Sequence, residues 1–155
     1  MRRGGAGGNA GPYPRNGPLD LTDMEDGQAK YVVFNGVENQ YADHPLPVDT
    51  GQLLRLYVLN AGPDHFSSFH VVGAVFHTVE PSGSPGAALH GLQAWTVGPG
   101  DAAMFELRLS QAGNYPFVTH AMDDMAKGAM GTFAASAGAE AKALLPSAAV
   151  ANAGA

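Results

Sequence analysis

Residues 113–133 read GNYPFVTHAMDDMAKGAMGTF and predict a strand, a short turn and a second strand. The first strand reaches His120, and the second begins after Gly128. The polar residues between them are enough for one helical turn. Imidazole is a favoured ligand of copper and zinc, so a histidine at such a corner is a candidate metal ligand.

Short runs of β-branched, aromatic and alternating residues recur on both sides of this stretch. They lie at residues 30–34, 52–60, 67–73, 75–79, 93–97 and 103–109, separated by turn signals such as Asn35-Gly36. About seven or eight short strands with almost no helix predict an all-β fold, a Greek-key β-sandwich.

Composition supports a turn-rich globular protein. The chain has 155 residues, of which 45% are hydrophobic and only 14% charged, with 21 Gly and 11 Pro. A net charge of -6 without any basic cluster argues against a nucleic-acid partner. No window approaches the roughly 20 apolar residues of a membrane-spanning helix, so we expect none.

Both ends of the chain differ from its centre. We expect a flexible N-terminal arm or linker at residues 1–27, a β-sandwich domain at residues 28–135 and an Ala-rich, disordered or loosely packed tail at residues 136–155. Arg2-Arg3 precede Gly, Ala, Asn and Pro rather than an apolar run, so no signal peptide is expected. The cellular location stays undetermined.

The six histidines occupy different settings. His44, His65 and His90 lie in polar or Gly/Pro-rich loops, where a solvated histidine is expected. His77 is near the end of an apolar strand and could face either side.

His70 and His120 each lie within an apolar strand, about fifty residues apart. Burying an imidazole is costly unless both nitrogens find partners, so one interpretation is a hydrogen-bonded core histidine. The other is a pair of metal-site residues. Two histidines do not complete a typical site, and further ligands would come from another histidine, water or another chain.

The polar turn after His120 offers further candidate groups. Thioether sulfur suits Cu(I), but Met122, Met125 and Met130 are expected to pack in the core instead. Asp123 and Asp124 are expected to solvate the turn rather than accept a hydrogen bond from an imidazole.

Several chemistries are excluded by what the sequence lacks. There is no cysteine, so the chain cannot supply the thiolate of a type 1 (blue) copper site. It also contains no Gly-x-Ser-x-Gly elbow, phosphate loop or dinucleotide fingerprint.

Taken in order, several segments resemble the second (C-terminal) cupredoxin domain of the copper-containing nitrite reductases, in the multicopper oxidase superfamily. The resemblance covers roughly residues 29–135 and rests on YVVFNG at 31–36, LYVLNAGP at 56–63, SSFHVVG at 67–73, GNYPFVTH at 113–120 and KGAMG at 127–131. Each segment alone is weakly specific, whereas the ordered set with both histidines is considerably more specific.

The resemblance implies a cupredoxin sandwich in an enzyme that reduces nitrite to nitric oxide. In that family a subunit has two such domains, and three subunits form a homotrimer. The first domain holds a type 1 copper, and a type 2 copper is bound by three histidines at a subunit boundary. On the motif match, His120 corresponds to the third type 2 copper ligand, and His70 to a proton-handling active-site histidine that does not bind copper.

The sequence also departs from the family pattern. It lacks the first domain, with its cysteine and two type 2 ligands, and His77 stands where many relatives carry an aspartate. We therefore expect an isolated chain to be inactive. The open alternatives are a terminal piece of the enzyme, a half that assembles with a first-domain chain, and a non-catalytic cupredoxin-like structural or binding module. A small copper carrier using His70, His120 and the methionines ranks last.

Overall fold

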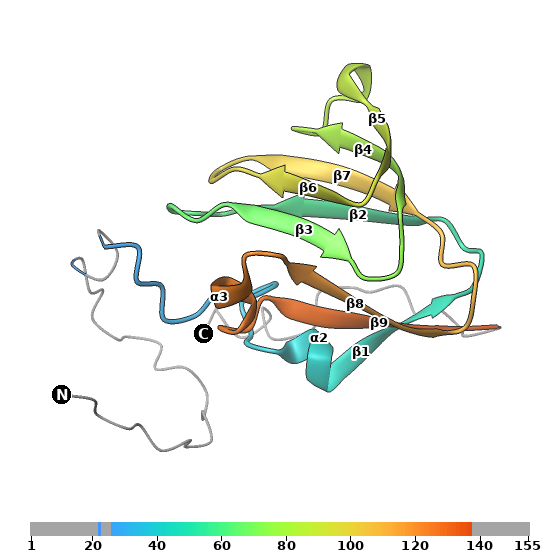
Figure 1. The fold of residues 1–155 in the computed structure, drawn as a ribbon, viewed down its shortest axis with the longest axis horizontal. Helices are drawn as coiled ribbons and strands as arrows, with labels where there is room; N and C mark the ends of the chain where they lie inside the picture. The colour runs from blue at the N-terminus through green and yellow to red at the C-terminus, as the bar shows by residue number, and fades with distance from the viewer. Residues whose placement is uncertain (1–21, 23–25, 138–155) are drawn as a thin grey trace, which may run out of the picture.

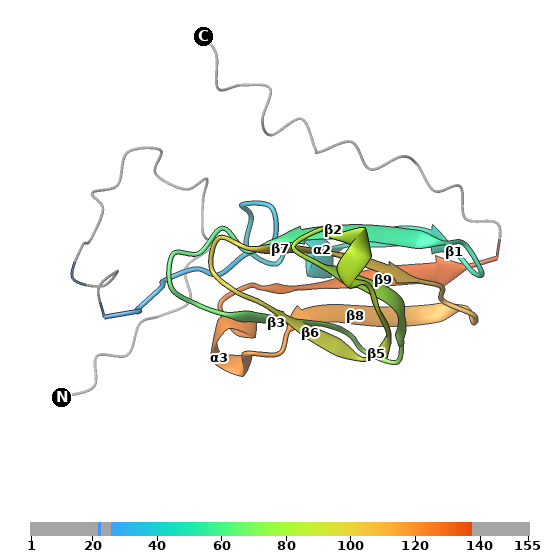
Figure 2. The ribbon, with the colours of Figure 1, turned by 90° about the horizontal axis from the view of Figure 1, so that it is seen from above.

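The computed structural model describes residue 22 and residues 26–137, which form two facing β-sheets (Figures 1 and 2). Two helical turns and one 3-10 turn accompany the strands in this part of the chain. In chain order the elements are α2 (Gln40–Asp43), β1 (His44–Asp49), β2 (Leu54–Leu59), β3 (Ser67–Val71), β4 (Phe76–Pro81), η1 (Pro85–Ala87), β5 (Leu89–Leu92), β6 (Ala94–Val97), β7 (Ala102–Leu107), β8 (Gly113–Thr119), α3 (Met122–Met125) and β9 (Met130–Ser136). None of the helices in this part of the chain has the length and apolar character needed to cross a membrane.

The strands divide into a five-stranded and a four-stranded sheet. Their orders are β1-β9-β8-β3-β6 and β2-β7-β4-β5. Neighbours are antiparallel except β1, which runs parallel to β9. The chain changes sheet after β1, β2, β3, β5, β6 and β7. The predicted all-β Greek-key sandwich is confirmed.

Aromatic side chains from both sheets fill the space between them. Phe69 on β3 lies at the centre, with its ring centroid 5.0 Å from that of Phe105 and 6.0 Å from that of Phe76. Phe117 on β8 packs against it at 6.3 Å. Burying each such ring contributes about 1.5–3 kcal/mol. Because the odd-numbered residues of β3 are held inward, His70 is directed to the outer face.

The strand predicted at residues 30–34 is wrong. The structure shows no strand there, and Val32 donates its N–H to the carbonyl of Lys127 at 3.3 Å. Phe34 packs against the core, and Asn35 then turns the chain with a φ of 54°. A run of β-branched residues can pack over a core without pairing in a sheet. Its composition alone does not distinguish this arrangement from a strand.

Two strands were not predicted. β1 contains Pro45 and Pro47, which have no backbone N–H, and it lies at the edge of its sheet. An edge strand has a neighbour on one side only, so it tolerates residues that cannot donate a hydrogen bond on the other side. β5 lies in a Gly/Ser/Pro-rich segment expected to be a loop and pairs with β4. The predicted helical turn after His120 is confirmed as α3.

Gly131 allows β9 to lie close to its neighbours. A Cβ at this position would be 2.6 Å from Cβ of Tyr41 and would overlap the ring of Phe117. Only a residue without a side chain fits here. The predicted N-terminal arm and Ala-rich tail lie mostly outside the described residues, and their boundaries stay predictions.

Candidate metal centre

His70 and His120 lie on adjacent antiparallel strands and on the same outer face of the five-stranded sheet. His70 is paired with Val118, and His120 extends the ladder because its N–H donates to the carbonyl of Ser68 at 2.7 Å. Thr119 is buried, so the side chain of the next residue faces outward. The two imidazole centroids are 5.6 Å apart, with the ring planes at 47°. The structure brings the two predicted site residues together.

The ring of His70 is oriented by a backbone carbonyl. Its Nδ1 lies 2.6 Å from the carbonyl oxygen of Gln93, immediately before β6. A carbonyl can only accept, so Nδ1 carries a proton and, in the neutral ring, Nε2 holds the free lone pair. The sequence prediction missed this contact because it depends on how β6 pairs with β3.

His120 is exposed, and its ring has no hydrogen-bond partner among the residues that the structure describes. Two apolar side chains that follow the histidines in sequence are also exposed, Val72 at 44% and Met122 at 55%. The expected core packing is therefore wrong for Met122, whereas Met125 and Met130 are half-buried. The His120 ring is therefore exposed and without a hydrogen-bond partner within the described residues, and residues near it in sequence expose apolar side chains.

The donor set fits part of a nitrogen-ligated copper site. Within residue 22 and residues 26–137, no group of three or more His, Cys, Asp or Glu side chains could hold a metal. Imidazole suits copper, and His120 would be one such ligand if copper bound here. A type 1 site does not fit, because the sequence contains no cysteine.

Three of the remaining histidines lie on other strands. His44 begins β1, and His77 and His90 lie on β4 and β5; all three are exposed. His90 donates from Nδ1 to the carbonyl of His77 at 3.1 Å. The exposure expected for His44 and His90 is confirmed, although neither lies in a loop.

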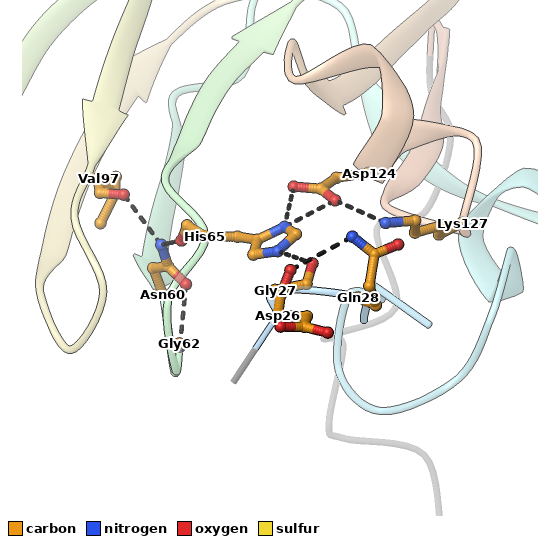
Figure 3. A network of polar contacts seen from close by, with 9 residues as sticks. All are labelled: Asp26, Gly27, Gln28, Asn60, Gly62, His65, Val97, Asp124 and Lys127. Carbon is orange, nitrogen blue, oxygen red and sulfur yellow. Dashed lines mark hydrogen bonds and ion pairs between the residues drawn. The ribbon is translucent and has the colours of Figure 1, made fainter. Parts of the chain in front are cut away.

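His65 is not solvated as predicted but forms an ion pair with Asp124 (Figure 3). Its Nδ1 is 2.9 and 2.8 Å from the two carboxylate oxygens, and its Nε2 is 2.7 Å from the carbonyl oxygen of Gly27. The hydrogen bond to Asp124, followed by that to Gly27, raises the pKa of His65, while burial opposes the shift.

Asp124 is buried and accepts this bond, so the prediction that it merely solvates the turn is also wrong. The two partners are 59 residues apart, and nothing in either local sequence indicates the pairing.

Comparison with known proteins identifies relatives of this chain. No protein-family model matches the chain. A copper-containing nitrite reductase of Neisseria gonorrhoeae is 35% identical over 116 residues, which cover 74% of this chain and 29% of that protein. The chain is a homologue of the copper-containing nitrite reductases. It spans less than a third of the length of the curated relatives that it matches.

Solved structures of copper nitrite reductases also resemble this nitrite reductase homologue in fold. The copper-containing nitrite reductase of Thermus scotoductus SA-01 superposes with a TM-score of 0.76 at 40% identity, covering 77% of this chain and 28% of that one. The copper nitrite reductase of Nitrosomonas europaea gives 0.76 at 31% identity, covering 79% and 46%. The cupredoxin-like fold expected from the sequence is confirmed.

Proposed function

We propose that the chain is the second-domain part of a copper nitrite reductase-like enzyme, which converts nitrite to nitric oxide. The observation that carries this proposal is the His70–His120 pair, two imidazoles 5.6 Å apart on one outer face. One ring is fixed by a carbonyl, and the other is exposed and unpaired within the described residues. The two histidines therefore have different roles.

His120 is the type 2 copper ligand in this proposal. Its backbone is held by the bond to Ser68, while its ring projects from the sheet at the start of the α3 turn. One ligand does not make a site, so the other histidines come from another domain or chain across a subunit boundary. When bound, copper would supply the redox chemistry and a coordination position for nitrite.

His70 is the proton-handling residue. Reduction of nitrite consumes one electron and two protons and releases nitric oxide and water. The Nδ1–H bond to Gln93 holds the ring so that Nε2 is available on the solvent side of the sheet. An imidazole in this position can pass protons to bound nitrite directly or through water without itself binding the metal.

The partner in this proposal is a first-domain cupredoxin chain, or subunits of the same family in a homotrimer or hetero-assembly. It supplies the type 1 copper with its cysteine and the two missing type 2 ligands. Exposed Val72 and Met122 provide apolar surface that such a contact would cover. An isolated chain is accordingly inactive.

A second candidate is a non-catalytic cupredoxin-like structural or binding module. The absence of a three-ligand group from the described residues, together with the absence of cysteine, favours it. Titrating the isolated full chain with Cu(II) while recording nitrogen hyperfine structure by EPR tests this alternative. A tight stoichiometric nitrogen-ligated site would contradict a purely structural role.

The proposed function is tested by co-expression with a first-domain chain, followed by copper analysis and a nitrite turnover assay. We expect His120→Ala to lose the type 2 copper, and His70→Ala to keep the copper but lose most turnover. His44→Ala, which changes an exposed histidine on β1, is the matched control and should behave as the unmodified chain. Intact copper content and turnover in His120→Ala would refute the assignment.

A further inference from the structure

His65 bridges two parts of the chain, the segment that contains Gly27 and the α3 turn that contains Asp124 (Figure 3). Nδ1 contacts the carboxylate of Asp124, and Nε2 contacts the carbonyl oxygen of Gly27. A carbonyl and a carboxylate can only accept hydrogen bonds, and a neutral imidazole has only one N–H to donate. Both contacts are satisfied as hydrogen bonds only when the ring is an imidazolium.

The residue on one side of the bridge organises the turn that follows His120. The Asp124 side chain is only 8% exposed, and Lys127 Nζ lies 3.5 Å from Oδ1, one of the two carboxylate oxygens that His65 contacts. The backbone carbonyl of Asp124 accepts the N–H groups of Lys127 and Ala129, and its own N–H donates to Ala121. A fixed Asp124 therefore fixes the link between β8 and β9.

Gly27, on the other side of His65, has a backbone conformation that favours glycine at this contact. Gly27 has a φ of 65°, a conformation that other residues rarely adopt, and a Cβ there would lie 3.5 Å from Nε2 of His65. Gln28 closes the short segment by donating to the carbonyl of Asp26 at 3.3 Å. Val32 adds a second link, since its N–H donates to the carbonyl of Lys127.

We propose that His65 is a positioning residue for His120. As an imidazolium between Asp124 and Gly27, it clamps the segment at residues 26–28 onto the turn that follows the ligand. Loss of the ring proton breaks one of the two bonds and loosens that turn. The part of the inference that concerns copper rests on the proposed function, whereas the clamp itself does not.

The charges around the ring determine how the clamp responds to pH. The carboxylate of Asp124 and the carbonyl of Gly27 favour the charged ring and raise its pKa, while burial and Lys127 oppose this. The clamp is therefore closed below the ordinary histidine pKa of about 6.5 and opens as pH rises through the higher value in the folded protein. The charged groups facing His65 or next to its contacts are Asp124, Asp123 and Lys127 around α3, Asp26 beside Gly27, and Asp64 on its own loop.

The clamp can be tested by NMR on the full chain, recording imidazole nitrogen shifts and amide hydrogen exchange against pH. We expect both His65 ring nitrogens to be protonated at about pH 6. His65→Gln should speed hydrogen exchange of the Ala129 and His120 amides by about tenfold, because the turn opens locally without the clamp. The increase in exchange rate that the unmodified chain shows as His65 loses its proton should then be absent. His65→Arg, which is charged at every pH tested, should restore protection without this increase.

His90→Gln, an exposed strand histidine, is the matched control and should leave exchange unchanged. Asp124→Asn keeps the side-chain shape and serves as a second variant if His65→Gln does not fold; it should accelerate the same amides. A singly protonated His65 ring at about pH 6, or unaltered exchange in the variants, would overturn the clamp.

A second arm measures Cu(II) affinity in the assembly with a first-domain chain. His65→Gln should weaken binding by about tenfold, the lower end for residues that support a ligand indirectly, and His65→Arg should restore it. If the unmodified chain binds copper and His65→Gln binds it equally well, the positioning role is refuted. If the unmodified assembly binds none through His120, the proposed function fails, and the exchange data alone decide the clamp.

Discussion

Replacing Asn60 by alanine should lower the free energy of unfolding by about 2–4 kcal/mol. Asn60 Nδ2 donates to the carbonyls of His65 at 2.7 Å and Val97 at 3.0 Å, and its Oδ1 accepts the N–H of Gly62 at 3.0 Å (Figure 3). Each bond contributes about 0.5–1.5 kcal/mol net, and the side chain is only half-buried, so water can compensate part of the loss. Three bonds sum to about 1.5–4.5 kcal/mol, and the expected loss lies within this range because water offsets the upper end.

Urea unfolding followed by the fluorescence of Trp95 measures this loss. With a urea dependence of about 2 kcal/mol per molar, the middle of the usual range, the midpoint should fall by about 1–2 M. Asn60→Asp keeps the acceptor for Gly62 but turns a carboxylate toward two carbonyls, so it should destabilise at least as much as two lost bonds. Asn114→Ala, at an exposed site on β8, is the control. A loss below about 0.5 kcal/mol, or one no larger than the control, would refute the reasoning.

Three further predictions concern the scaffold. Gly131→Ala should cost about 1–3 kcal/mol or more in urea unfolding, because its Cβ overlaps the ring of Phe117; an unchanged midpoint would contradict that packing. Arg55→Gln should leave the midpoint unchanged although Nε lies 2.6 Å from Glu106 Oε1, since Arg55 is exposed and the pair is screened; a clear loss would contradict this. The pKa of His65 is raised on folding, so its contribution to the free energy of unfolding is fully present below about pH 6.5 and is lost as pH rises through the pKa in the folded protein. His65→Gln should remove this pH-dependent part of the unfolding free energy. An unchanged dependence on pH would contradict the prediction.

The fold could be predicted where side-chain periodicity and turn residues agree. Residues 113–133 alternate around a polar interruption, and the structure has β8, α3 and β9 there. The strand prediction failed where the amino-acid composition of a segment does not match its actual pairing in a sheet. Residues 30–34 look like a strand but pack Phe34 over the core, whereas β1 contains two prolines and still pairs at an edge.

The candidate site was only partly predictable. The setting of His70 and His120 in apolar strands indicated them, and strand pairing then placed both on one face. The carbonyl of Gln93 gives no signal in sequence, because any residue could supply it. The pairing of His65 with Asp124 depends on a contact between a loop and α3, which are distant in sequence, and local composition wrongly suggested a solvated ring.

The most direct test of the proposed site is the EPR spectrum and copper content of this chain assembled with a first-domain cupredoxin. With unmodified His120, we predict one type 2 copper signal per chain; with His120→Ala, we predict that this signal and nitrite turnover are lost together. A type 2 signal that persists undiminished in His120→Ala would contradict the central claim that His120 is the ligand this chain contributes.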